Sequence, residues 1–122
     1  MNREEVETFA RQWADAWNNR DVEKVLEHFH EDVIFTSPTA LAVVGRPTVN
    51  GKDALRAYWA KALNRIETIR FSIERLVWDP QRRELAIIYM SEINGKSKKV
   101  SENLIFNQNG FVVTAEVFYG IS

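Results

Sequence analysis

The sequence predicts an α+β fold in which helices cover one face of a mainly antiparallel sheet. Two patterns lead to this prediction. In the first half of the chain apolar side chains recur at helical spacing, and from residue 69 onward they alternate with polar residues between turn signals. Helices and strands that are segregated along the chain in this way are typical of α+β domains.

The first helix is predicted to begin after Asn2, because Asn2 and Glu5 have the spacing of a capping box. A break at residues 18–20 ends it, and Asp21 is placed to cap a short second helix. The apolar face of the first helix consists of Val6, Phe9, Ala10, Trp13 and Trp17.

Residues 32–37 contain a run of β-branched and aromatic side chains and predict a short strand that ends at Pro38. Residues 38–51 contain two prolines and two glycines and are expected to form a loop, although the middle of this loop is unusually apolar. A third helix is predicted from Lys52. Its apolar stripe comprises Leu55, Tyr58, Trp59, Ala62, Leu63 and Ile66.

The remaining chain is predicted to form a four-stranded antiparallel meander. The strands lie at residues 69–77, 85–93, 100–106 and 111–119, and the turn between the second and third is Asn94-Gly95, a strong hairpin signal. On the last strand, alternation places Phe111, Val113, Ala115, Val117 and Tyr119 on one face. The other face is expected to hold Val112, Thr114, Glu116 and Phe118, with Leu76, Trp78 and Ile105 as further candidates.

Both faces of this meander are therefore partly apolar, whereas the helices can cover only one of them. A contiguous apolar surface on a small protein commonly marks an interface. We expect the second face to meet another copy of the chain, which predicts a homodimer.

The 122 residues predict a single domain over 1–122. A net charge of −1 gives no basic field for nucleic acid, and the absence of cysteine excludes disulfides and thiolate metal sites. No apolar run is long enough to predict a membrane span, and the charged first residues do not resemble a signal peptide. We expect a cytoplasmic protein without a cofactor or a metal.

One residue breaks the apolar pattern of the strand at 100–106. Glu102 shares its predicted face with Val100, Leu104 and Phe106, so its carboxylate is expected to point toward the interior. An ionised carboxylate in such a place is costly unless it is paired, and burial raises its pKa. Three alternatives follow: Glu102 lines a pocket, with or without a catalytic role, it forms a salt bridge with an arginine or lysine, or the register differs and leaves it in solvent.

Several segments together resemble the nuclear transport factor 2-like superfamily, and its SnoaL-like branch in particular. They are Trp13 and Trp17, then 18–21, 26–33, 51–55, and the pair Phe106-Asn107 with residues 110–112. The resemblance implies a strongly curved sheet that forms a cone with the helices, a pocket inside the cone, and dimerisation through the outer face of the sheet.

The superfamily includes ketosteroid isomerase-like enzymes, polyketide cyclases, dehydratases and proteins with no catalytic role. In the isomerases a helical Tyr and a protonated Asp hold an oxyanion, and an Asp before a Pro is the base. At the matching positions this chain has Trp13, Glu102 and Ser37. Because a lone Ser is a poor proton acceptor, the resemblance does not imply steroid-type isomerisation.

The leading hypothesis is therefore a protein that binds a small, largely apolar molecule in the cone. The alternatives are an isomerase, dehydratase or cyclase with Glu102 as its acid–base group, and a structural dimerisation module with a filled cone. A cavity of a few hundred cubic ångströms next to Glu102 would argue against the last. The expected ligand-binding residues are Trp13, Trp17, Phe35, Ser37, Trp59, Glu102 and Tyr119.

Overall fold

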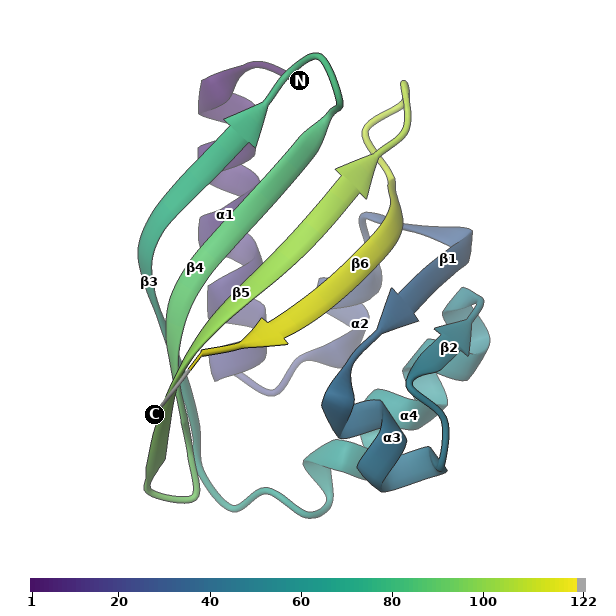
Figure 1. The fold of residues 1–122 in the computed structure, drawn as a ribbon, viewed down its shortest axis with the longest axis vertical. Coiled ribbons are helices and arrows are strands. Elements are labelled where there is room, and N and C mark those ends of the chain that lie inside the picture. Colours follow the sequence, from purple (N-terminus) through teal and green to yellow (C-terminus); the bar gives the residue numbers. More distant parts are fainter. Residues whose placement is uncertain (121–122) are drawn as a thin grey trace.

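A computed structural model describes residues 1–120. These residues form four helices and six strands (Figure 1). In chain order they are α1 (Arg3–Asn18), α2 (Val22–Leu26), β1 (Phe29–Thr36), α3 (Pro38–Val44), β2 (Thr48–Asn50), α4 (Lys52–Leu63), β3 (Ile69–Asp79), β4 (Glu84–Ile93), β5 (Lys96–Phe106) and β6 (Val112–Tyr119).

The six strands form one sheet in the order β2-β1-β6-β5-β4-β3, and α1 crosses behind β3, β4 and β5 (Figure 1). Strands β3 to β6 pair antiparallel with their chain neighbours, as the meander prediction required. Strand β1 runs parallel to β6 and makes the sheet mixed. The α+β class is confirmed.

Helix α1 begins as predicted and is fixed at both ends. The Glu5 amide donates to Asn2 Oδ1 at 2.8 Å, and the Asn2 amide donates to Glu5 Oε1 at 3.0 Å, which completes the capping box. At the other end Asn18 bonds both backbone groups of Phe71 in β3, at 2.7 and 3.0 Å. Arg20 then donates hydrogen bonds to two carbonyls at the C-terminal end of α4, those of Leu63 and Ile66, at 2.8 Å each. The polar stretch after α1 thus joins it to the sheet and to α4.

Residues 38–51 are not the loop that the sequence predicted. Ser37 caps α3 by accepting a hydrogen bond from the Thr39 amide, and Pro38 occupies the first turn, where its missing N–H is harmless. Gly45 ends the helix with a φ of 79°, a conformation that favours glycine. Strand β2 then pairs antiparallel with β1. Helix α3 has only seven residues, about two turns, which are too few to establish a periodic apolar pattern.

A β-bulge in β3 overturns part of the predicted outer face. The pairing of β3 with β4 shifts between Ile73 and Arg75, so that the faces of the strand are exchanged after this point. Leu76 and Trp78, expected outside, pack against the core, and Trp78 meets the ring of Phe106 at 6.1 Å. Val77, which the regular alternation placed inside, is instead 53% exposed.

A second bulge reverses the predicted side-chain directions at the beginning of the last strand. Phe106 pairs with Val112, but Ile105 pairs with Thr114, so Val113 has no opposite residue. Val112 is therefore buried and Phe111 exposed, the reverse of the prediction. From Thr114 onward the alternation holds, and Ala115 and Val117 point into the core.

The core lies between α1, α4 and the concave face of the sheet and is rich in aromatic rings. Trp59 contacts the rings of Trp17, Phe29 and Phe35 at centroid distances of 4.9–5.5 Å. These edge-on contacts fix the shape of the interior.

Of the described helices, none combines the length and apolar character that a membrane span requires.

Candidate functional site

Glu102 projects from the middle of β5 into the interior. Its partners in the sheet are Ile87 on β4 and Val117 on β6, which face the same way and are buried. The glutamate residue itself is only 5% exposed. Its predicted inward orientation is confirmed, and no salt bridge to it is present within residues 1–120.

The carboxyl group of Glu102 lies beside the indole of Trp13, which α1 presents from the opposite wall. The two groups are close enough to interact, but their geometry falls short of a complete hydrogen bond. As a result Glu102 Oε2 and Trp13 Nε1 are both buried without a hydrogen-bond partner among the described residues. Buried polar groups are nearly always satisfied, so such a pair requires an explanation.

Burial raises the pKa of the Glu102 carboxyl from 4.5 to about 8, and the neighbouring Trp13 N–H lowers it by a smaller amount. Desolvation dominates because no cation is near enough to stabilise the charged form. At neutral pH the carboxyl group is therefore largely protonated. In that state it can donate one hydrogen bond and accept another.

A chamber of about 110 Å³ reaches Glu102, and side chains from α3, α4 and the sheet line it. It is smaller than the few hundred cubic ångströms expected, because aromatic side chains occupy much of the cone. Its size approaches that of an apolar cavity of about 150 Å³ known to admit a benzene ring. The cone is therefore only partly filled.

The mouth of the chamber is bounded by Thr39 on α3 and Tyr119 on β6, whose hydroxyl groups form a short hydrogen bond. The ammonium group of Lys98 lies 4.3 Å from the centroid of the Tyr119 ring. This is a cation–π contact. Tyr119 thus links the helical wall, the sheet and a surface cation at the entrance.

A profile of the SnoaL-like domain matches residues 10–101. The chain belongs to the SnoaL-like domain family. Among curated proteins, none matches the sequence significantly.

Solved structures agree with this assignment. A SnoaL-like protein of unknown function from Burkholderia thailandensis shares 26% identity and a TM-score of 0.89 over 98% of each chain. A protein of unknown function with a cystatin-like fold from Methylobium petroleophilum shares 21% identity, with a TM-score of 0.81 over 100% of this chain and 80% of that one. The epoxide hydrolase/cyclase-like enzyme SalBIII, described in pyran ring formation in salinomycin, shares 16% identity, with a TM-score of 0.77 over 98% and 94%.

Most of the ligand-binding residues predicted from the sequence line the chamber. Trp13 is the exception, since it lies behind the chamber wall, stacked on Phe71 at 5.6 Å and edge-on to Tyr89 at 5.0 Å. The nominated residues that do line the chamber are Trp17, Phe35, Ser37, Trp59, Glu102 and Tyr119.

Thr39 and Tyr58 line the chamber but were not nominated. Thr39 was missed because α3 was read as a loop, and Tyr58 because it was assigned to the apolar stripe of α4. Burial raises the pKa of Tyr58 to about 12, and the pKa of Tyr89 is raised well above its usual range, also mainly by burial. Both phenols therefore remain protonated hydrogen-bond donors near Glu102.

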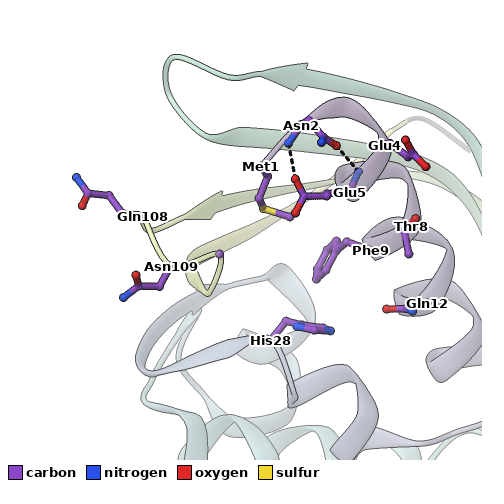
Figure 2. A pocket seen from close by; sticks show the side chains of 11 residues that line it. Met1, Asn2, Glu4, Glu5, Thr8, Phe9, Gln12, His28, Gln108 and Asn109 are labelled. Atoms are coloured by element: carbon purple, nitrogen blue, oxygen red, sulfur yellow. Dashed lines mark hydrogen bonds between the residues drawn. The ribbon is translucent and has the colours of Figure 1, made fainter.

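A wider hollow of about 550 Å³ lies near the start of α1 (Figure 2). The side chains of Gln108 and Asn109 point away from the others, and Glu5 is already engaged in the capping box. His28 lines it but packs against the ring of Phe9 at 5.7 Å, while His30 accepts a hydrogen bond from the Asp32 amide. Within residues 1–120 no group of three potential metal ligands comes together. The hollow has none of the convergent chemistry found at Glu102.

Proposed function

We propose that this SnoaL-like protein binds a small, largely apolar molecule whose polar atom meets Glu102. The observation that carries the proposal is the unsatisfied pair of Glu102 and Trp13 beside an apolar chamber. Leaving a buried polar group unpaired costs about 1–3 kcal/mol. A ligand that provides the missing partner recovers this free energy on binding.

The chemistry of the wall indicates which polar atom fits. The protonated carboxyl of Glu102 has an O–H to donate, and the phenols of Tyr58 and Tyr89 are protonated as well. The surrounding side chains are otherwise mostly apolar. A compact molecule with one acceptor oxygen, such as a ketone, matches this arrangement.

The test is a comparison of cyclohexanone with methylenecyclohexane, which has nearly the same shape but no acceptor oxygen. We expect cyclohexanone to bind more tightly, with shifts in the NMR signals of the Trp13 indole and the Glu102 carboxyl. Val117→Phe should fill the chamber and abolish binding, whereas Val113→Phe, at the β6 bulge, should not. If neither compound binds at millimolar concentration, the proposal fails and a purely structural cone becomes the better account.

Acid–base catalysis by Glu102, as in an isomerase, dehydratase or cyclase, is the second candidate function. It is favoured by the pKa of about 8, since a group that titrates near the working pH both gives and takes a proton efficiently. No second carboxylate and no histidine lines the described chamber, so Glu102 would have to serve both steps. If Glu102→Gln left the turnover of an identified substrate unchanged, this candidate would be excluded.

We further propose a cytoplasmic homodimer that forms through the outer face of the sheet. Support for the dimer comes from exposed apolar side chains on that face, such as Ile34 and Phe118. The partly exposed Ile105 lies on the same outer face, because its neighbours Leu104 and Phe106 point into the core. Covering this surface with a second copy would remove apolar area from water.

A further inference from the structure

A second hollow, of about 360 Å³, adjoins the chamber at its mouth, and we call it the vestibule. The chamber and the vestibule share five lining residues, so the two spaces lie on either side of one boundary. Together they fall within the range of about 300–1,000 Å³ typical of ligand sites, which the chamber alone does not reach. The shared residues are Thr39, Ala62, Ile66, Ile93 and Tyr119.

The vestibule carries cations on the same face of the sheet as Glu102. Strand alternation places Lys96 and Lys98 in line with Val100 and Glu102 along β5, so the strand leads from two ammonium groups to the buried carboxyl. Arg65, which follows α4, adds a third positive charge from the opposite side.

Within residues 1–120 no acidic side chain neutralises these positive charges. Among the described residues that line the vestibule there is no aspartate or glutamate. Lys99, on the other face of β5, is paired with Glu74 at 3.1 Å, whereas Lys96, Lys98 and Arg65 make no ion pair within residues 1–120. In a chain with a net charge of −1 this is a local positive field beside an apolar chamber.

We infer that the natural ligand is an amphipathic carboxylate, with its apolar body in the chamber and its anionic group in the vestibule near Arg65, Lys96 and Lys98. This inference rests on the proposed function, because it takes the chamber to be the binding site. It adds the substrate class, namely small organic acids with an apolar end. Ser91, 7% exposed and opposite Lys98 in the sheet, offers a hydroxyl group for the same carboxylate.

The experiment compares phenylbutyrate with phenylbutanol, which differ chiefly in the charge of the terminal group. Titration calorimetry and NMR on the full chain should show the carboxylate binding about tenfold more tightly at low salt, with the advantage shrinking as salt is added. The triple variant Arg65→Gln, Lys96→Gln, Lys98→Gln should abolish the advantage, so that phenylbutyrate binds no more tightly than phenylbutanol to this variant. A control with the same change in net charge is Lys24→Gln, Lys52→Gln, Arg82→Gln, which should keep it.

The possible outcomes separate this inference from the proposed function. Equal binding of the acid and the alcohol overturns the inference and leaves the chamber as a neutral ligand site. An advantage for the acid that survives in the triple variant places the anion elsewhere and also overturns it. If cyclohexanone binds but neither phenylbutyrate nor phenylbutanol does, the inference of an amphipathic ligand is wrong. If no probe binds, both proposals fall.

Discussion

The carboxyl group of Glu102 on β5 and the indole N–H of Trp13 on α1 adjoin each other in the interior, and each lacks a complete hydrogen bond. This relationship joins the helical layer to the sheet through two polar atoms in a largely apolar core. It also moderates how Glu102 responds to pH, because the indole N–H partly offsets the larger effect of burial on the pKa of the carboxyl group.

The stability of the protein should fall as the pH rises from about 4.5 to about 8. Below this window both folded and unfolded chains hold the Glu102 proton, and within it only the unfolded chain releases it. The folded state therefore binds more protons, and Glu102 should contribute a decrease of up to about 1.4 kcal/mol per pH unit. Above about pH 8 the contribution levels off.

Glu102→Gln should lack this decrease and should exceed the wild type in stability at neutral pH. Urea unfolding across the same window measures the difference between the two proteins. Glu27→Gln, an exposed change at the end of α2, is the matched control and should follow the wild type. Parallel profiles for wild type and Glu102→Gln would show that Glu102 titrates normally in the folded protein.

Trp13→Phe should raise the pKa of Glu102 further, because it removes the N–H that lowers it. An NMR titration of the Glu102 side-chain carbon gives this pKa directly. The smaller ring should also lower stability by about 1–2 kcal/mol through lost contacts with Phe71 and Tyr89. Trp17→Phe, which removes a different indole, should leave the Glu102 pKa unchanged. A pKa that stays the same or falls in Trp13→Phe contradicts the proposed contact.

The meander and the inward direction of Glu102 could be predicted because they depend on signals within a few residues. Asn94-Gly95 fixes a hairpin, and strict alternation from Val100 to Phe106 assigns each side chain to a face. The bulges at Glu74 and Val113 have no comparable signal. One extra residue leaves the composition of a strand unchanged but exchanges its faces, which is why Leu76, Trp78 and Val112 were misplaced.

The chamber was only partly predictable for a related reason. The residues that line it follow from the fold, and Trp17 and Trp59 were found through the helical spacing of the apolar stripes on which they lie. Its volume depends on how the aromatic side chains pack against one another, which is a property of three-dimensional contacts and not of spacing. The cations of the vestibule were visible in the sequence, but their position beside the chamber became apparent only when α4 and the β4–β5 hairpin were brought together.

The bulge in β3 can be tested with a pair of adjacent substitutions. Leu76→Ala should destabilise the protein by about 2 kcal/mol because Leu76 packs on the core, whereas Val77→Ala should change stability by less than about 0.5 kcal/mol. Chemical denaturation of the two variants provides the comparison. An unbroken strand would give the opposite order, since Val77 would then point inward.

Tyr119→Phe should loosen α3, because it removes the hydroxyl group that bonds Thr39. Hydrogen exchange should become several-fold faster at the amides of Ala40 and Gly45, which close the turns of this helix, with little change in β4 or β5. Thr39→Val should have the same effect, and the double variant should add little to either single change. Additive effects would mean that the two hydroxyl groups act independently.

Phe118→Glu should convert the proposed dimer to a monomer. Phe118 is 49% exposed on the outer face of β6, and a carboxylate in its place would lose hydration wherever a second copy covers it. Sedimentation equilibrium at micromolar concentration should give twice the mass of one chain for the wild type and the mass of one chain for the variant. Phe111→Glu makes the same chemical change at the β5–β6 turn, where the side chain is 40% exposed, and should remain dimeric. A wild type that sediments as a monomer would refute the dimer, and dissociation caused equally by both changes would place the interface elsewhere.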